Sequence, residues 1–379
     1  MTCWQEMPLG EFITLQRGFD LTEREATPGQ YPVFSSGGQS YTTDVPKVEG
    51  PGVITGRKGV LGKVHYSAGP FWPHDTTLWV KDFKGSVPRF VHYLLQTLPL
   101  ASLDAGAANP TLNRNHAHLL PVTVPDALAQ ERIAGVLGGI DDLIENSQQR
   151  VAVLRQMARA IYREWFVHFR FPGHDGLQVV ESGIPDGWQI RTLGEMSHNF
   201  DRRRQPLSKV QRDKRRGEIP YYGAAKLIDR IDGWIFEGEY LLFAEDGSVA
   251  TVDGHPVLQL VEGKFWANNH THILQGDGVS TRFLYLACEQ LPVRPYVTGA
   301  AQPKITQGNL NRMPVLVGPD EIQSAFEEVI SPLFDELRCL KKQAESLTAI
   351  RDLLLPHLVS GRVDLSGLDL QALMGGAVA

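Results

Sequence analysis

Two segments of the chain carry apolar or small side chains in the seven-residue pattern of a coiled coil. In the first, the spacing alternates between four and three residues through Ile133, Leu137, Ile140, Ile144, Ser147, Val151, Leu154, Ala158, Ile161 and Trp165. The second segment has the same spacing at Phe326, Ile330, Leu333, Leu337, Leu340, Ala344, Leu347, Arg351, Leu354 and Leu358. The pattern predicts two long helices that bury their stripes against each other, in an antiparallel pair.

A helix of about 40 residues is a rod of roughly 60 Å, so such a pair would hold whatever lies at its two ends a fixed distance apart. Pro332 predicts a kink or a restart near the beginning of the second helix. Gly135, Gly138 and Gly139 are expected to weaken the first turns of the other helix.

The two segments before these helices have a different pattern. Short apolar runs rich in Val, Ile, Phe, Tyr and Trp are cut by Gly and Pro every few residues, which predicts strands and turns with little helix. The same strings recur about 193 residues apart. GAANPTLNRNHAHLLPVTVP (106–125) aligns with GAAQPKITQGNLNRMPVLVG (299–318), RFVHYLLQTLP (89–99) with RFLYLACEQLP (282–292), and FWPHDTTLWV (71–80) with FWANNHTHIL (265–274). The chain is therefore predicted to be a tandem duplication of the α+β class, with a pseudo-twofold internal repeat.

Composition narrows the class of protein. The chain has 379 residues, a formal charge of -6, and three cysteines far apart in sequence. It shows no apolar run of membrane-spanning length and no secretory signal, so we expect a soluble cytoplasmic protein. The two β-rich segments, 1–125 and 184–318, hold 10 basic against 10 acidic and 16 against 15 side chains, so the acidic excess lies in the helical segments. The net charge therefore does not exclude a nucleic-acid partner for the β-rich domains.

A pair of related domains on a rigid spacer suits a ligand that repeats along a line, and duplex DNA is the commonest such ligand. The two domains share a frame but differ in their loops. The predicted DNA target is therefore bipartite and asymmetric.

The arrangement resembles the specificity (S) subunit of type I restriction-modification systems over residues 1 to about 365. The strings that carry the resemblance are QERIAGVLGGIDDLIENSQQ, ARAIYREWFVHFRFPG, IPDGWQIRTLGE and IRDLLLPHLVSGRV. The resemblance implies two tandem β-rich target-recognition domains separated by two long antiparallel coiled-coil helices. It divides the chain into recognition domain 1 (1–125), spacer helix 1 (126–171), recognition domain 2 (184–318), spacer helix 2 (319–362) and a tail (363–379).

The resemblance also implies a non-catalytic chain that reads DNA sequence and binds two modification (methyltransferase) subunits and the restriction (motor-nuclease) subunits. S-adenosylmethionine would then bind the modification subunit, and ATP and Mg²⁺ the restriction subunit, with no cofactor on this chain. The sequence agrees in one respect, because no Asn/Asp-Pro-Pro-Tyr/Phe string of an amino-methyltransferase appears in it. A self-contained nuclease and a coiled-coil scaffold whose β domains bind proteins are the alternatives.

Basic segments indicate where DNA would bind. In domain 1, the glycine-rich turn GRKGVLGKV carries Arg57, Lys58 and Lys63, which would contact DNA or belong to a solvated loop. In domain 2, the run DRRRQPLSKVQRDKRRGEIP is the densest basic segment, and we predict phosphate contacts from Arg202, Arg203, Arg204, Lys209, Arg212, Lys214, Arg215 and Arg216. For base readout the candidates are Ser35, Ser36, Gln39 and Tyr41 in domain 1, and Tyr222, Lys226, Asn268 and Asn269 in domain 2, although each could be an ordinary turn residue.

Three other motifs resemble a phosphate loop, a nuclease site and a metal cluster, but the sequence does not favour these sites. GRKGVLGKV departs from the phosphate-loop spacing and has Val64 where Ser or Thr would bind magnesium. Asp253, Glu262 and Lys264 resemble a nuclease motif, but the first repeat has Ala68 at the position of Glu262. His74, His270 and His272 are expected to be core or groove-facing histidines rather than a metal cluster. In the second repeat, the segment that aligns with the basic turn of domain 1 carries Glu245 and Asp246 instead. These carboxylates would accept a cytosine amino group or face water.

Overall fold

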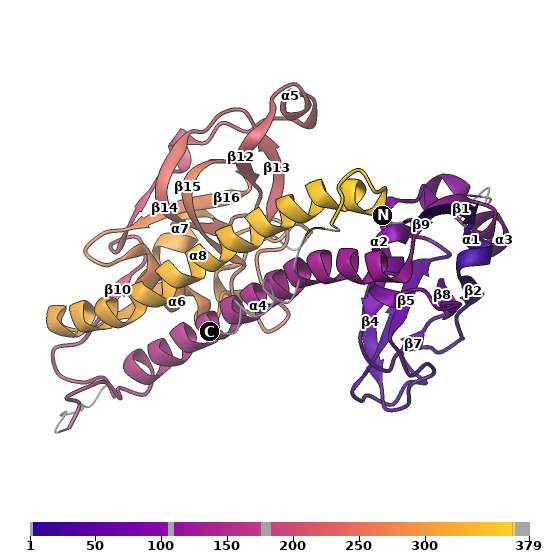
Figure 1. Cartoon of the computed structure of the whole chain (residues 1–379). Helices are drawn as coiled ribbons and strands as arrows, with labels where there is room; N and C mark the ends of the chain where they lie inside the picture. Colours follow the sequence, from indigo (N-terminus) through magenta and orange to yellow (C-terminus); the bar gives the residue numbers. More distant parts are fainter. Residues whose placement is uncertain (1–2, 105–109, 176–182, 300, 366, 368–379) are drawn as a thin grey trace. The chain divides into compact units, whose positions relative to one another are not determined.

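The computed structural model describes residues 3–104, 110–175, 183–299, 301–365 and 367. They form two compact units, residues 1–148 with 342–379, and residues 149–341. Two helices of 40 residues each, α4 (Ala127–Phe166) and α8 (Asp320–Val359), contribute one part to each unit (Figure 1). The rest of each unit is a β-rich domain with a few short helices, so the fold is α+β as predicted.

In the described residues of the first unit, the β-rich domain has three small sheets. An antiparallel pair joins β1 (Trp4–Pro8) to β9 (Pro121–Pro125). The four-stranded sheet has the order β2 (Thr14–Arg17), β8 (Thr77–Asp82), β5 (Gly52–Gly56), β6 (Val64–Ser67), and the three-stranded sheet has the order β4 (Gly38–Thr43), β3 (Tyr31–Ser35), β7 (Trp72–Pro73). The short helices are α1 (Leu9–Phe12), α2 (Pro88–Thr97), the 3₁₀ turn η1 (Leu100–Leu103) and α3 (Arg114–His118).

The β-rich domain of the second unit has two sheets within the part of the chain that the structure describes. β10 (Gln189–Thr192) pairs with β17 (Pro314–Val317). The six-stranded sheet has the order β11 (Ser197–Asn199), β16 (Thr271–Gly276), β14 (Phe236–Ala244), β15 (Leu258–Ala267), β12 (Arg216–Tyr222), β13 (Leu227–Ile231). Its short helices are η2 (Asp201–Arg203), α5 (Lys209–Asp213), α6 (Thr281–Glu289), η3 (Arg294–Tyr296) and α7 (Gln307–Asn311).

The two domains have one topology, which confirms the predicted duplication. Strand β15 of the second domain takes the places of two strands of the first domain, β6 and β7. These two strands are separated by a short segment that contains Gly69 and Pro70. Even the register agrees, because Val33 pairs in parallel with Trp72 in the first domain and Tyr221 with Trp266 in the second. The repeated Gly-Ala-Ala of residues 106–108 lies outside the described residues.

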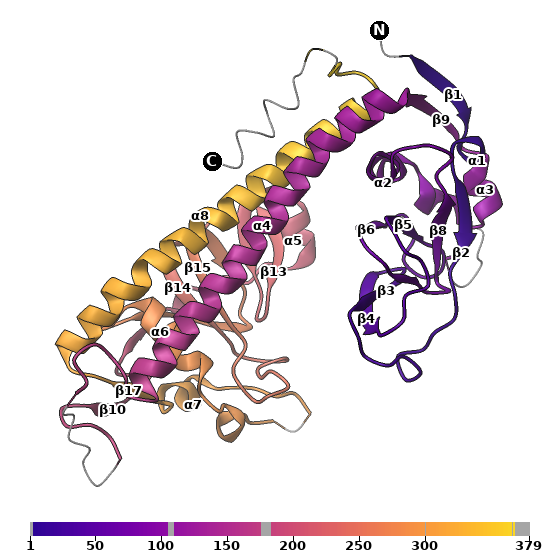
Figure 2. The ribbon, with the colours of Figure 1, turned by 60° about the horizontal axis from the view of Figure 1, so that its bottom comes forward.

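In each unit, parts of α4 and α8 run side by side in opposite directions (Figures 1 and 2). In the first unit, Ile133 and Leu137 of α4 share a core with Leu358 of α8 and with Phe90 and Leu94 of α2. The second unit has the equivalent arrangement around aromatic side chains: Tyr162, Trp165 and Phe166 of α4, Phe326 of α8 and Phe283 of α6. The antiparallel helix pair predicted from the heptad pattern is therefore confirmed, and every predicted stripe position is buried or half-buried.

The expectation that Pro332 restarts the second helix is wrong, because α8 runs unbroken from Asp320 to Val359. A proline removes one N–H and leaves the carbonyl four residues earlier without its helical partner. Here both Pro332 and Glu328, the residue that carries this carbonyl, are exposed, so water can satisfy the carbonyl at little cost. Among the described residues, no helix combines the length and the apolar character needed to cross a membrane.

Replacing Phe326 with alanine should destabilise the second unit by about 3–5 kcal/mol, because the change opens a cavity in a packed core. Phe326 is fully buried, and its ring lies 4.9 Å from that of Phe166 and 5.6 Å from that of Trp165. Chemical denaturation of the two proteins measures the difference. Leu353→Ala on the same helix is the control, since Leu353 is 66% exposed and its loss should cost less than about 0.5 kcal/mol. Equal losses for both variants would contradict the assigned core.

Candidate nucleic-acid interface

In the first domain, two of the predicted contact regions lie together. The basic turn is a hairpin loop between β5 and β6, and Lys58 and Lys63 on it are exposed. Ser36, at the β3–β4 turn, lies beside the start of this loop, since a Cβ on Gly59 would lie 3.6 Å from its hydroxyl. Gln39 is exposed on β4. The structure therefore brings Ser36 to the basic loop, a proximity that the sequence did not show.

Arg57 is held more firmly than its neighbours on the loop. Its side chain is only 15% exposed, and its Nε donates to the backbone oxygen of Asp75 at 3.0 Å. Asp75 also accepts from Arg17 at 3.0 Å and lies 3.1 Å from the ring of His74. Burial lowers the pKa of Arg57, and the charge of Arg17 lowers it further, although Asp75 opposes both effects. Of the polar atoms in the described residues, Arg57 Nη2 is one of the few that are buried without a hydrogen-bond partner.

The loop after β14 is the structural equivalent in the second domain. Arg57 N donates to Thr76 O, and Glu245 N donates to His270 O. The backbone of Lys58 forms an isolated antiparallel β-bridge with that of Thr111, and the backbone of Asp246 forms one with that of Lys304. Position by position, Arg57 and Lys58 therefore correspond to Glu245 and Asp246, so the two domains carry opposite charge at the same place in one fold.

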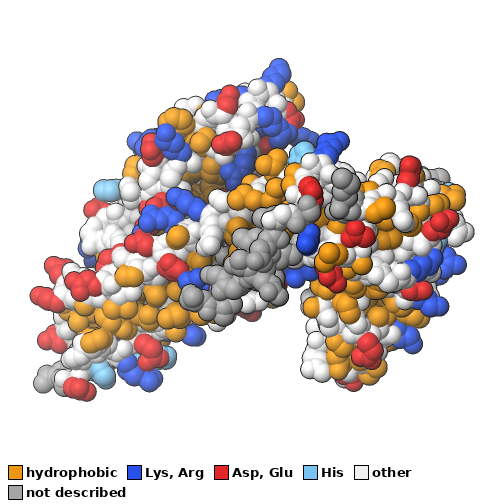
Figure 3. Space-filling model, in the orientation of Figure 1, with side chains coloured by type: hydrophobic (Ala, Val, Ile, Leu, Met, Phe, Trp, Pro, Cys, Tyr) orange, Lys and Arg blue, Asp and Glu red, His pale blue; other side chains and the backbone are white. Residues whose placement is uncertain are grey.

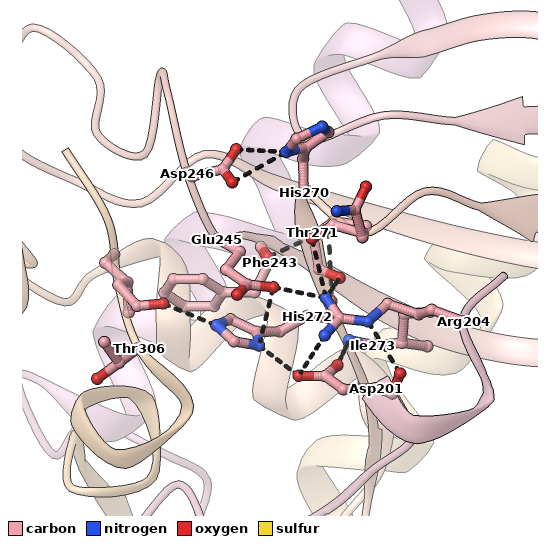
Figure 4. Close-up of polar contacts among 12 residues, drawn as sticks. Asp201, Arg204, Phe243, Glu245, Asp246, His270, Thr271, His272, Ile273 and Thr306 are labelled. Carbon is pink, nitrogen blue, oxygen red and sulfur yellow. Dashed lines mark hydrogen bonds and ion pairs between the residues drawn. The ribbon is translucent and has the colours of Figure 1, made fainter. Parts of the chain in front are cut away.

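Asp246 and His270 form an accessible pair on this loop (Figure 4). The ring Nδ1 of His270 lies 2.8 Å from Asp246 Oδ1, with side chains that are 48% and 19% exposed. His270 is therefore a surface-facing histidine, and sequence reasoning did not identify Asp246 as its partner.

Glu245 and Arg204 belong to a largely buried ionic cluster with Asp201 and His272 (Figure 4). The more exposed Lys304 also joins this cluster. Arg204 donates to Glu245 Oε2 at 2.5 Å and to the backbone oxygen of Thr271 at 2.9 Å. Lys304 lies 3.0 Å from the other oxygen of Glu245. His272 is 1% exposed, and its two ring nitrogens face Asp201 at 2.5 Å and the backbone oxygen of Ile305 at 2.8 Å.

Burial raises the pKa values of Asp201 and Glu245, but their cationic partners more than offset this effect. For Asp201, the hydrogen bond and charge of His272 bring the pKa below its ordinary value. For Glu245, hydrogen bonds from Arg204 and Lys304 do the same. The two carboxylates are therefore ionised at neutral pH, and the cluster ties the loop after β14 to η2 and to the strand β16.

Asp201, Glu245 and His272 also have ligand atoms within 4.8 Å of one another, the spacing of a small metal site. Arg204 and Lys304 already lie against these carboxylates, and the His272 ring nitrogens already face oxygen atoms. A divalent cation would have to displace both basic side chains. We therefore assign this trio to the ion-pair network of the domain.

Most of the predicted basic residues of the second domain lie around α5 and the strands beside it, where Figure 3 shows Lys and Arg side chains gathered. Several are stacked on aromatic rings: Arg203 on Phe236 at 5.0 Å, Arg212 on Tyr221 at 5.1 Å, and Arg215 on Trp266 at 5.0 Å. A stacked guanidinium keeps its charge while losing part of its rotamer freedom. These side chains are therefore oriented before any ligand arrives.

The other members of the basic segment differ in how far they are engaged. Arg212 and Arg216 both bind Asp229, and Arg216 also pairs with Asp213. Arg202, Arg203, Lys209, Lys214 and Arg216 are exposed, and so is Lys226, which follows the segment. Arg204, by contrast, is held in the buried cluster, where it stabilises the domain. The assignment of these residues to DNA stays a prediction.

The predicted asparagines have different positions. Asn268 is 7% exposed, and its side-chain oxygen accepts from the backbone N–H of His270, so it shapes the loop. Asn269 is exposed beside it. Tyr222 is half-buried at the end of β12, where its backbone oxygen accepts from Asn268 N.

Two residues of the nuclease-like motif have other partners. Glu262 pairs with Arg338 of α8, and Lys264 lies over the ring of Trp234 at 3.9 Å. The turn that resembled a phosphate loop joins two antiparallel strands, whereas a phosphate loop leads into a helix.

The chain is similar to one family of known proteins. Residues 185–349 match the family model of the type I restriction modification DNA specificity domain. A Haemophilus influenzae protein described as a type I restriction enzyme specificity subunit is 33% identical over 158 residues, which is 41% of this chain and 40% of that protein. The chain thus spans less than half the length of this relative. The type I restriction enzyme MjaIX specificity subunit of Methanocaldococcus jannaschii is 23% identical over 93% of this chain and 84% of its own length.

The fold is also similar to a solved structure, the S subunit of a type I restriction-modification system from M. genitalium. The TM-score is 0.64 at 20% identity, with 94% of this chain and 96% of that chain covered. At this identity, the likeness concerns the fold.

The buried cluster predicts a pH-dependent contribution of Glu245 to stability. Because its folded pKa is below the ordinary value, the contribution should be full above about pH 5 and fade as the pH falls through the folded pKa. Glu245→Gln should therefore lower the free energy of unfolding by about 1–3 kcal/mol at pH 7, and the difference from the parent protein should shrink towards pH 3. Denaturation at a series of pH values measures this. Glu237→Gln, at an exposed site in the same domain, is the control. A difference that does not change with pH would contradict the ionised cluster.

Proposed function

From the similarity of this chain to type I restriction-modification specificity subunits, we propose that it belongs to that family and reads a bipartite, asymmetric DNA target, with one recognition domain for each half-site. The observation that carries the proposal is the duplication of one β-rich domain, each copy packed on its own part of an antiparallel helix pair. Duplex DNA presents equivalent grooves at regular intervals, so two such domains can contact two short sequences separated by a spacer.

The difference between the half-sites would arise from the loops. At equivalent positions, the first domain has Arg57 and Lys58 where the second has Glu245 and Asp246. Basic side chains favour guanine acceptors and phosphates, whereas carboxylates accept from the amino group of cytosine. Two domains with opposite charge in the same place would select different base sequences.

Phosphate binding would come mainly from the second domain. Arg202, Lys209 and Lys214 are exposed there, and Arg203 and Arg215 are held by aromatic rings. These cations would position the duplex, while polar loop residues such as Lys226 and Asn269 would contact base edges. The first domain has fewer such cations, and Lys58 and Lys63 on the hairpin loop would serve there.

The long helices would bind the other subunits of the system. They expose several large apolar side chains: Leu143, Val153, Met157, Val329 and Leu353. Exposed apolar side chains on acidic helices suit protein partners better than DNA. We infer two modification subunits as these partners, with S-adenosylmethionine bound to them, and restriction subunits that bind ATP and Mg²⁺. This chain, which we expect in the cytoplasm, would supply specificity and no catalytic group.

The decisive experiment is purification of the chain with and without co-expressed modification subunits, followed by selection of bound sequences from random duplexes. We expect a split motif and adenine methylation within it. A complex that selects no sequence and methylates no adenine would overturn the proposal in favour of a protein-binding scaffold. Cleavage of DNA by the isolated chain with Mg²⁺ would favour the nuclease alternative.

Replacing Arg202, Lys209 and Lys214 with alanine should weaken binding to all duplexes alike and reduce the salt dependence. Each lost phosphate contact lowers the slope of log affinity against log salt by about 0.9, so the slope should fall by about 1 to 3. Titrations of specific and unrelated duplexes at several salt concentrations measure it. Lys81→Ala, an exposed lysine at the end of β8, is the control and should leave the slope unchanged. A loss confined to certain base pairs would mean that these residues read sequence.

Deleting one heptad from both helices together, residues 143–149 and 340–346, should shorten the spacer between the half-sites. Seven helical residues span about 10.5 Å, which corresponds to about 3 base pairs. Both half-site sequences should stay the same, because the recognition domains are unchanged. Methylated-site sequencing reads out the motif. A deletion from α4 alone is the control, since it puts the two stripes out of register and should abolish binding. Altered half-sites with an unchanged spacer would contradict the role of the helices.

A further inference from the structure

The two domains attach to the helices through the same polar contact. Arg89, on α2 of the first domain, donates to both carboxylate oxygens of Asp142 on α4 and to the backbone oxygen of Gly138 at 3.1 Å. Arg282, on α6 of the second domain, donates to Asp335 on α8 at 3.0 Å and to the backbone oxygen of Ser331 at 3.2 Å. We call these the first bridge (Arg89, Gly138, Asp142) and the second bridge (Arg282, Ser331, Asp335).

The bridges are equivalent residue by residue. Arg89 and Arg282 open the repeated strings RFVHYLLQTLP and RFLYLACEQLP. Their partners follow at the same intervals in both halves, with a small residue one helical turn before the aspartate. Each arginine thus binds the long helix that follows its own domain in the sequence.

Gly138 shows that this contact shapes the helix. A Cβ at this position would lie 2.6 Å from Arg89 Nε and 2.7 Å from its Cζ. Glycine in a helix interior is unfavourable compared with alanine. Here it leaves room for the guanidinium of Arg89, whereas the second bridge has Ser331 at the equivalent position. In the second bridge, Arg282 is 14% exposed and is also held by Glu239 at 2.9 Å.

Apolar packing holds the domains on the helices but is not directional, so it resists separation more strongly than a small slide or rotation. A two-pronged arginine contact to a carboxylate and a neighbouring backbone oxygen has one geometry only. On the basis of the proposed function, we propose that Arg89 and Arg282 are positioning residues that fix the register of each recognition domain on its helix, and thereby the spacer length that the protein accepts.

The test uses the complex with co-expressed modification subunits. Selection from random duplexes first defines the half-sites of the parent protein, and a second library then varies the spacer between them. Arg89→Met and Arg282→Met should retain both half-sites. The fraction of selected duplexes with a spacer one or more base pairs away from the preferred length should rise about two- to fivefold, the scale of one lost partly exposed ion pair.

The Gly138→Ala variant distinguishes a change in the position of the domain on its helix from a loss of folding stability. The new methyl group displaces Arg89 while alanine favours the helix, so the melting temperature should stay the same or rise while the spacer preference broadens. The reversed pair Arg89→Asp with Asp142→Arg should narrow the preference again. Arg150→Met is the matched control, because Arg150 forms an exposed ion pair with Glu336 between the helices and touches neither domain through it.

The outcomes are distinct. If the parent complex selects no split motif, the proposed function itself is contradicted. A split motif whose spacer distribution is the same in Arg89→Met, Arg282→Met, Gly138→Ala and Arg150→Met would overturn the inference alone. If Arg89→Met does not fold, Gly138→Ala and the reversed pair still decide it.

Discussion

The structure depends on the burial of two apolar stripes that neither long helix can hide alone. A heptad stripe on an isolated helix would stay in water, and the antiparallel pairing of α4 with α8 removes both stripes from it. The β-rich domains pack on the same stripes, through α2 in the first unit and through α6 in the second. One hydrophobic constraint therefore forms the helix pair and also places a domain on each part of it.

Within the domains, the duplicated frame separates what must stay constant from what can vary. The strand order and the backbone hydrogen bonds around the loop after β5 recur around the loop after β14. Backbone contacts do not depend on side-chain identity, so the loops can exchange Arg57 for Glu245 without a change of fold. In each domain the charge of this loop residue is balanced by neighbours of opposite sign. Asp75 lies near Arg57 in the first domain, and Arg204 and Lys304 bind Glu245 in the second. A fold of this kind can change the charge of its loops without losing its core.

The buried cluster shows why charge runs are difficult to interpret. Arg202, Arg203 and Arg204 are consecutive, yet they have three different environments. Arg202 is exposed, Arg203 lies over the ring of Phe236, and Arg204 is drawn into the domain by Glu245. The chain turns through η2 at this point, and the direction of each side chain follows from that turn. No periodicity in the sequence announces such a short 3₁₀ segment.

The amino-acid sequence by itself determined the class of fold, the duplication and the helix pair, because these depend on patterns that span many residues and tolerate local error. Seven-residue spacing sustained over ten positions defines a helix face wherever the chain goes. The partners of individual charged residues were decided only by the tertiary structure. Arg204 meets Glu245 across 41 residues, and Arg89 meets Asp142 across 53. Such pairs depend on how loops and helices come together in space, and a single sequence does not encode these distances in any local signal. Likewise, the unbroken path of α8 through Pro332 depends on which side of the helix faces water, which only the packed structure decides.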